Sequence, residues 1–509
     1  MLKIEIEEKP VTIEISMETQ EIKKEDKQNY KLIHYGLIVF VFVQVMFYFT
    51  FSEPLTVLFG GEPIIPGLIS DDINRSARFI MIYHSLAVPF LVANTFWIME
   101  YYDLRSKYVP TLKILLVSGA IMVGTAGMLF GFTYIRLFHE IFYFGLFLVF
   151  LGGIIFVVAA FPIPGKFPNE ENSIEGSHTN GLSLENMNLV ILAICIMVST
   201  IMGAIAALEN FTGTIWPADM LINGKREPVA FLAEAIIRHH HHDVVEDFVV
   251  SHLHIQLAQS AAMVMMVAYR TSKMSGKAYT GVLLTNAIGV IIISYGSWVL
   301  NHYVIWVGAG ILIICTIALG AFGLKNVVRE KLGDRYESAT RGEKIKALLS
   351  NPILFNYYFL FLMSHIFVTI TGIIVGLQVD EVYRAPGTVE LEYDFNVGHW
   401  HVLSVLIANI LMCKAIDYYK VKGLQRKIGG WVFFIGGVLA FGGADLYMLR
   451  PYDTATQPWY TIMLIGVWLL FIAFVWGVIA ITKRLLEDRK ESKMLLLGNQ
   501  YEQSIAKQV

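Results

Sequence analysis

Long apolar runs, separated by short polar segments, repeat along almost the whole chain of 509 residues. A helix needs about 20 apolar residues to cross the hydrocarbon core of a bilayer. The pattern therefore predicts an all-α polytopic membrane protein with twelve transmembrane helices. The predicted spans are 32–52, 78–101, 111–132, 137–161, 186–208, 251–270, 279–300, 303–324, 353–377, 398–418, 429–448 and 459–482.

The composition agrees with this pattern. Hydrophobic residues make up 55% of the chain and charged residues only 16%, whereas soluble domains are about a quarter charged. The mean hydropathy is +0.57. The three cysteines, Cys195, Cys315 and Cys413, all lie in apolar runs and belong to no C-x-x-C-H motif for attached haem. A water-soluble enzyme and a disulfide-stapled secreted domain are both excluded.

Lys and Arg are concentrated in alternate loops, those after spans 2, 6, 8 and 10, while the intervening loops carry more acidic residues. The positive-inside rule therefore predicts a protein of the cell membrane with both termini in the cytoplasm. We expect one catalytic membrane domain, 32–482, between cytoplasmic tails at 1–31 and 483–509. Within it, 209–250 is a large outer loop and 325–352 a cytoplasmic loop.

Histidines of four predicted spans fall near the same membrane face. Given the predicted topology, they lie within about two helical turns of the outer ends of spans 2, 6, 7 and 10. Polar groups inside a bilayer are costly and generally mark a functional site, and imidazole is a common ligand of haem iron, copper and non-haem iron. The alternative is that each ring only joins helices through a backbone carbonyl. The residues are His84, His252, His254, His302, His399 and His401.

The spacing of these residues refines the prediction. His399 and His401 are two apart, hence about 200° apart around a helix, so each suits a different haem on opposite sides of span 10. His252 and Gln256 are four apart and share a helix face, so Gln256 reaches whatever His252 binds. By the same geometry His254 points elsewhere.

This ordered set resembles the catalytic subunit I of the haem-copper oxidase and nitric oxide reductase superfamily. The resemblance covers residues 30–482. Its most specific parts are Val397-Gly398-His399-Trp400-His401, the stretch from Tyr295 to Gly308, and the separation of 50 residues from His252 to His302.

The resemblance implies two haems and a second metal. His84 and His401 would be axial ligands of a low-spin haem, expected to be of b type, and His399 the proximal ligand of a high-spin haem. His252 and His302 would hold non-haem iron or copper facing that haem. Arg450, in the outer turn after span 11, would pair with haem propionates, since a guanidinium binds carboxylates in a bidentate fork.

The chain also departs from the family pattern. Where the family has two adjacent histidines, this sequence has Asn301-His302, or His302-Tyr303 in the neighbouring register. The candidates for the missing third ligand are Asn301, Tyr303, Gln256, His254 and an acid from the outer loops. Oxygen reductases often carry a redox tyrosine four residues after the span-6 histidine, and nitric oxide reductases with non-haem iron carry a glutamate there. Gln256 occupies this position. One oxygen-reductase branch takes the tyrosine from span 7, where Tyr295 stands six residues before Asn301.

Reduction of O₂ to water needs four electrons, and the family's tyrosine supplies one. Coupling of two NO molecules to N₂O needs two. We therefore expect an oxidoreductase of the nitric oxide reductase type, with Gln256 and Tyr295 among the candidate catalytic residues. The alternatives are a terminal oxygen reductase, a nitric oxide dismutase-like enzyme, a dihaem electron carrier without catalysis, and a transporter with a polar midplane site.

Electrons must come from elsewhere, because this chain has no haem c motif and no dinuclear copper domain. We expect the donor to be an electron-donor subunit, a soluble cytochrome c or cupredoxin, or a quinol. The other expected partner is membrane lipid, and no nucleic acid partner is expected.

Polar residues of spans 7 and 8 either line a proton path from the cytoplasm or pack helices, and His365 in span 9 packs helices or joins such a path. The residues of spans 7 and 8 are Thr285, Asn286, Ser294, Tyr295, Ser297 and Thr316.

Overall fold

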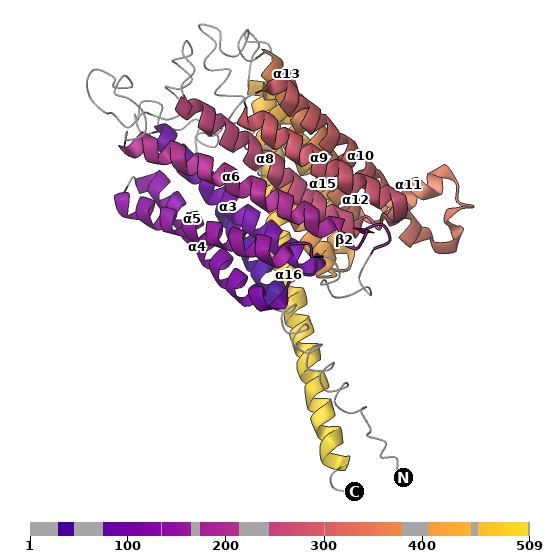
Figure 1. Ribbon diagram of the computed structural model, residues 1–509. Helices are drawn as coiled ribbons and strands as arrows, with labels where there is room; N and C mark the ends of the chain where they lie inside the picture. The colour runs from indigo at the N-terminus through magenta and orange to yellow at the C-terminus, as the bar shows by residue number, and fades with distance from the viewer. Residues whose placement is uncertain are drawn as a thin grey trace, which may run out of the picture.

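A computed structural model describes residues 29–44, 75–133, 135–163, 174–212, 244–299, 301–378, 406–448 and 457–506. These residues are almost entirely helical and run side by side in a bundle (Figure 1). The helices are α3 (Arg75–Tyr101), α4 (Val109–Thr133), α5 (Arg136–Ala160), α6 (Leu184–Thr212), α8 (Val244–Thr271), α9 (Gly276–Trp298), α10 (His302–Leu332), α11 (Arg341–Leu349), α12 (Pro352–Met363), α13 (Thr369–Gln378), α15 (Leu424–Met448) and α16 (Gln457–Ala506). Helical segments at 29–44 and 406–418 complete the bundle.

Nine helices in the described residues are long and apolar enough to cross a membrane. They coincide with nine of the predicted spans, so the helical membrane architecture is confirmed. The other three predictions fall on helical segments outside this set: 251–270 lies within α8, and 32–52 and 398–418 overlap the described segments 29–44 and 406–418. The total of twelve spans therefore stays a prediction.

Consecutive helices pack closely in pairs, most extensively α4 with α5, α9 with α10, and α15 with α16. Small residues make this approach possible, as is usual between membrane helices. A Cβ atom added at Gly466 of α16 would lie 2.1 Å from the backbone nitrogen of Ala440 in α15, and one at Gly308 of α10 would lie 2.5 Å from the nitrogen of Ile293 in α9. Glycine is therefore required at both contacts.

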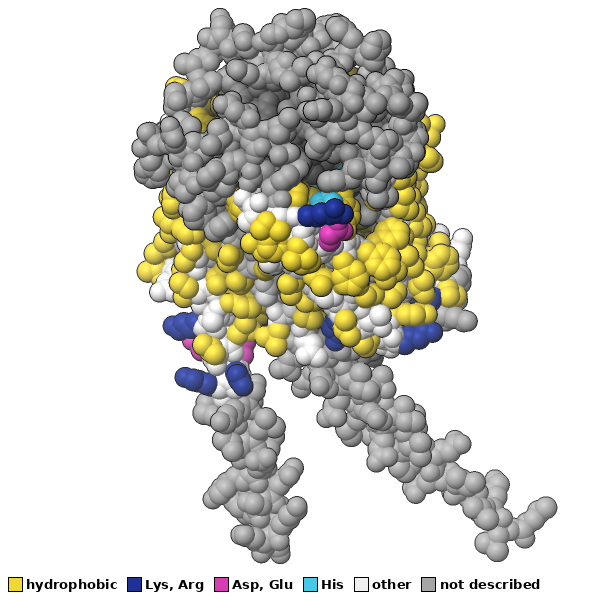
Figure 2. Space-filling view, turned by 90° about the vertical axis from the view of Figure 1, so that its left-hand side faces the viewer, with side chains coloured by type: hydrophobic (Ala, Val, Ile, Leu, Met, Phe, Trp, Pro, Cys, Tyr) yellow, Lys and Arg dark blue, Asp and Glu magenta, His cyan; other side chains and the backbone are white. Residues whose placement is uncertain are grey.

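Large apolar side chains also cover the outside of the bundle. Figure 2 shows them as a belt around one face, with Lys and Arg side chains along its lower edge. On α9 the exposed side chains recur every three or four residues, which is one face of a helix. An exposed apolar stripe of this length suits contact with lipid rather than water. Its members are Leu284, Ile288, Ile291, Tyr295 and Trp298.

The basic loops that the sequence places on one membrane side do meet at one end of the bundle. Arg270 at the end of α8 pairs with Glu185 at the start of α6, and Lys273 pairs with Glu330 near the end of α10. Arg426 donates to Asn351 at 3.1 Å. The predicted alternation of the loops is thus consistent with the structure, and the assignment of this end to the cytoplasm stays a prediction.

One predicted helix end is wrong. His302 was expected to close the seventh span, but it is the first residue of α10. The reason is a helix cap: the side-chain oxygen of Asn301 accepts a hydrogen bond from the Val304 backbone nitrogen at 3.2 Å. An Asn cap favours the start of a helix, so the break falls before His302 rather than after it.

Candidate functional site

The predicted site residues divide between described and undescribed parts of the chain. His399, His401 and Arg450 lie outside the described residues. Of the others, His84 is on α3, His252 and Gln256 on α8, and the remaining four near the junction of α9 and α10. The junction residues are Tyr295, Asn301, His302 and Tyr303.

The structure brings His84 and His252 together. Their ring centroids are 5.8 Å apart and the ring planes differ by 13°. His84 also contacts Phe142 of α5, whose ring is edge-on to it at a centroid distance of 5.8 Å. Two residues 168 positions apart in the sequence therefore lie side by side.

The orientation of the His252 ring is fixed by α6. Its Nδ1 lies 2.7 Å from the backbone oxygen of Ser199. A carbonyl oxygen can only accept, so Nδ1 carries the hydrogen and Nε2 keeps the lone pair of the neutral ring. The Ser199 hydroxyl in turn donates to the backbone oxygen of His252 at 2.9 Å. Metal-binding histidines commonly donate their second N–H to a carbonyl in this way.

The absence of a side chain at Gly203 of α6 leaves space for the His252 ring. A Cβ atom at this position would lie 2.8 Å from both Cε1 and Nδ1 of His252. Any larger residue at 203 would push the imidazole away from the carbonyl that orients it. Nothing in the sequence pattern alone singled out Gly203 or Ser199.

Gln256 does share the His252 face of α8, as its spacing predicted. Its side-chain nitrogen donates to the hydroxyl of Thr200 at 3.2 Å and to the backbone oxygen of Ile196 at 3.4 Å. His254 is exposed and on another face, again as predicted. The Gln256 amide nitrogen is therefore used to bind α8 to α6, beside the histidine.

The junction of α9 and α10 is arranged differently from the expectation. Tyr295 belongs to the exposed stripe of α9, with 56% of its surface exposed, and Tyr303 is 73% exposed with its ring against Trp306. Asn301 uses its side chain as the α10 cap, and His302 is half-buried. Within the described ranges, no three or more His, Cys, Asp or Glu side chains come together as a metal-binding group.

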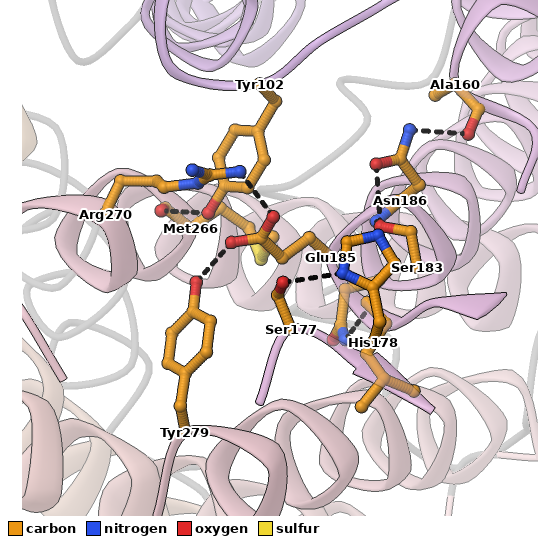
Figure 3. Close-up of polar contacts among 12 residues, drawn as sticks. Tyr102, Ala160, Ser177, His178, Ser183, Glu185, Asn186, Met266, Arg270 and Tyr279 are labelled. Carbon is orange, nitrogen blue, oxygen red and sulfur yellow. Dashed lines mark hydrogen bonds and ion pairs between the residues drawn. The ribbon is translucent and has the colours of Figure 1, made fainter. Parts of the chain in front are cut away.

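A second polar site lies at the opposite end of the same helices. The Glu185 carboxylate is buried between Arg270, whose Nη2 is 2.5 Å away, and the hydroxyl of Tyr279, which donates to it. The Arg270 guanidinium also lies over the ring of Tyr102, 4.9 Å from its centroid, and the Tyr102 hydroxyl donates to the Met266 backbone oxygen at 2.7 Å. Figure 3 shows this arrangement, which joins the residue after α3 to α6, α8 and α9.

A small hairpin lies next to this network. Strands β1 (His178–Thr179) and β2 (Leu182–Ser183) pair antiparallel across Asn180 and Gly181, both with positive φ. The Ser177 hydroxyl bonds Nδ1 of His178 at 2.8 Å, and Asn186 at the start of α6 donates to the Ala160 backbone oxygen at 3.1 Å. These contacts tie the start of α6 to the end of α5 (Figure 3).

Sequence reasoning did not single out Glu185 and Arg270. The sequence feature that could have indicated this pair is a residue of opposite charge at each of two predicted span ends on the same membrane side.

His365 makes contacts compatible with helix packing: its Nδ1 lies 2.9 Å from the Phe361 backbone oxygen, and its Nε2 lies 3.3 Å from the backbone oxygen of Ala261 on α8.

Comparison with known proteins adds no further identification. The chain matches no known protein family, and no curated protein is significantly similar to it.

Proposed function

We propose that this protein is a membrane-bound oxidoreductase that reduces a small diatomic gas at a high-spin haem and a neighbouring second metal. The preferred reaction couples two NO with two electrons and two protons to give N₂O and water. The observation that carries the proposal is the His252 ring, held by the Ser199 carbonyl with Nε2 as its basic nitrogen, next to the ring of His84.

His252 meets one requirement of a metal ligand, because the Ser199 carbonyl fixes its Nδ1 hydrogen and leaves the Nε2 lone pair for a metal. A packing histidine needs only one hydrogen bond to join two helices. His252 has that bond, and the α6 backbone additionally leaves room for the ring at Gly203. A transition metal bound to Nε2 would supply electrons and a binding position for the gas. The chain itself supplies the orientation of the ligand and an apolar surrounding.

The contact between the His84 and His252 rings constrains how close the proposed low-spin haem and second metal would be. The family resemblance assigns His84 to a low-spin haem and His252 to the second metal, which are different centres. Their rings are 5.8 Å apart, so the two proposed centres would be direct neighbours. A haem held by His84 and a metal held by His252 would thus have ligands that are adjacent side chains.

Two placements favour NO over O₂ as the substrate. The oxygen reaction in this superfamily uses a tyrosine beside the second metal. Gln256 replaces it on α8 and bonds to α6, and Tyr295 lies on the exposed stripe of α9. These two placements suit a two-electron reaction, which needs no tyrosine as an electron source. The oxygen reductase and dismutase-like reactions remain the alternatives, and electrons are proposed to come from a donor subunit, cytochrome c, cupredoxin or quinol.

The decisive experiment adds NO anaerobically to the purified, dithionite-reduced protein and measures N₂O by gas chromatography. We expect one N₂O for every two NO consumed, together with a visible spectrum in which one haem binds CO and one does not. Metal analysis in the same preparation separates iron from copper as the second metal.

Each alternative gives a different result in that set of measurements. Stoichiometric consumption of O₂ to water with no N₂O would identify an oxygen reductase. Two haems that both ignore CO would identify an electron carrier. A colourless, metal-free preparation would leave only a transporter and would overturn the proposal. The matched variants are His252→Ala, expected to lose turnover, and His254→Ala, expected to retain it.

A further inference from the structure

Two pairs of exposed apolar side chains lie at the end of the bundle that carries the basic loops. Ile345 and Leu349 are on α11, and Leu424 and Ile428 are at the start of α15. Ile345 is 53% exposed and Leu424 is 71% exposed. In each pair the two residues are four apart and therefore share one helix face. All four lie just before predicted membrane spans rather than within them, so a position in the hydrocarbon core does not account for their exposure.

The direction in which α11 presents its pair is determined by contacts with α10. The Tyr336 ring, in the turn between these helices, lies between two cations. The Arg329 Cζ of α10 is 4.8 Å from its centroid and the Lys344 Nζ of α11 is 4.6 Å from it. Ala347, on the other side of α11, is buried in the protein. The apolar pair is therefore held facing outward, and α11 lies at the edge of the bundle beside α12 (Figure 1).

The start of α15 is joined to the same region. Arg426 donates to the side-chain oxygen of Asn351, two residues after Leu349, at 3.1 Å. A Cβ atom at Gly430 of α15 would lie 2.9 Å from Cγ of Pro352, the first residue of α12. Both apolar pairs thus belong to one corner of the molecule, formed by residues 341–349 and 420–428, which we call the α11–α15 corner.

Basic side chains border both apolar pairs. At 100° per residue, one base lies on either side of the α11 pair and another beside the α15 pair, while two more precede α15. All five are exposed, and none of them belongs to the ion pairs formed among the described residues. The one acidic residue of α11, Glu343, is bonded to Thr340. The five bases are Arg341, Lys346, Lys420, Lys422 and Lys427.

This combination suits the surface of an anionic membrane. Lys and Arg side chains near such a surface are attracted to the phosphates of its lipids, and apolar side chains beside them enter the boundary between headgroups and acyl chains. A second protein is a poorer fit. A stable protein interface has about 20–30 residues a side around an apolar core, whereas here each small apolar pair is bordered by bases.

We propose that the α11–α15 corner binds the headgroups of anionic phospholipids. The five bases pair with the lipid phosphates, and the two apolar pairs contact the upper parts of the acyl chains. Lipid bound in this way would link the turn before α12 to the start of α15. The proposal depends on the membrane helices of the protein and not on the proposed oxidoreductase function.

The experiment compares two lipids on the purified full-length protein. Delipidated protein in detergent is mixed with equal amounts of dioleoylphosphatidylglycerol and dioleoylphosphatidylcholine, and the bound lipids are counted by native mass spectrometry. We expect the wild-type protein to prefer phosphatidylglycerol. The double variant Lys346→Gln, Lys427→Gln should lower this preference about tenfold, because each base near the lipid phosphates contributes to the attraction.

The double variant Lys107→Gln, Lys277→Gln is the matched control. It removes the same charge from two other basic loops, where both lysines are exposed and no exposed large apolar side chain lies within four residues. It should keep the wild-type preference. Equal binding of the two lipids by the wild type would overturn the proposal, and so would equal losses in the two double variants. Displacement of the lipid by water-soluble glycerophosphoglycerol would also overturn it, because the acyl chains would then contribute nothing.

A second measurement keeps all the lysines. Ile345→Cys is labelled with bimane and placed in vesicles that contain both lipids, with only one of them brominated; labelled wild-type protein gives the background from its own cysteines. Brominated phosphatidylglycerol should quench the bimane fluorescence more strongly than brominated phosphatidylcholine. Equal quenching by the two lipids, or none by either, would contradict an anionic lipid at this corner.

Discussion

The rings of His84 and His252 lie 5.8 Å apart and 13° from parallel, although they come from helices α3 and α8. His252 is oriented by the Ser199 carbonyl, which leaves Nε2 as its basic nitrogen. Two of the histidines predicted for one site thus lie side by side, and their arrangement leads to the first prediction.

Replacement of His252 by Ala should remove the proposed second metal while the protein keeps its helical fold. The side chain is half-buried and its loss leaves a small cavity beside α6, not an unpaired charge. Metal content per protein, measured on purified samples, should fall by one equivalent. His254→Ala, two residues away and exposed, should keep the wild-type metal content. An unchanged metal content in both variants would contradict the ligand role of His252.

Gly203→Ala should weaken metal binding without removing any ligand. The new Cβ would lie 2.8 Å from the His252 ring and displace it from the Ser199 carbonyl. Loss of such an orienting contact typically costs about 10–100-fold in metal affinity, which competition with a chelator would measure. Gly281→Ala on α9, where a Cβ meets nothing within 4 Å, should leave the affinity as it is. Equal affinities in the two variants would mean that the ring orientation has no effect on the metal.

Arg270→Ala should strongly destabilise the protein. It leaves the Glu185 carboxylate buried without its guanidinium partner, and breaking a buried pair in this way costs about 3–5 kcal/mol. The comparison is Lys273→Ala, whose pair with Glu330 is exposed and contributes roughly 0–1 kcal/mol. Thermal unfolding in detergent should rank the variants in this order. Similar midpoints would show that the Glu185 network does not stabilise the bundle.

Two roles of the Asn301 side chain can be distinguished by experiment: capping of α10 and binding of the proposed metal. As the α10 cap, its replacement by Ala should cost about 0.5–2 kcal/mol of stability, and replacement by Ser should cost little because Ser caps helices well. Metal content should be unchanged in both variants. Loss of the metal in Asn301→Ser, with stability preserved, would instead assign the Asn301 side chain to the second metal.

The stability of α11 should decrease at acidic pH. Hydrogen bonds from the Thr340 hydroxyl and backbone nitrogen lower the pKa of Glu343 below its usual value. A lowered carboxylate pKa stabilises the fold above the ordinary value of Glu, and that contribution is lost as the pH falls through the lowered pKa. Amide hydrogen exchange in α11 should therefore accelerate in this acidic range, and Thr340→Ala should exchange fast at neutral pH already. No difference between the two proteins would show that the Thr340–Glu343 hydrogen bonds do not stabilise the start of α11.

Local properties of the sequence were enough to predict much of the fold. Apolar runs of span length predicted the nine described membrane helices, because each must bury its backbone polar groups in lipid by itself. The four-residue spacing of His252 and Gln256 predicted their common face, since helix geometry depends only on the residue count. The alternating basic loops correctly predicted which helix ends lie together.

Only the tertiary structure determined which side chains of neighbouring helices are in contact. The Asn301 cap moved His302 into the following helix, and the rotation of α9 placed Tyr295 on its exposed stripe. The contacts of Glu185 with Arg270 and of His252 with Ser199 join positions 85 and 53 residues apart. Periodicity specifies which side chains share a face, but it contains no information on how far each helix is rotated and shifted against its neighbours. Those two quantities come from packing between helices, and they determine which polar groups meet.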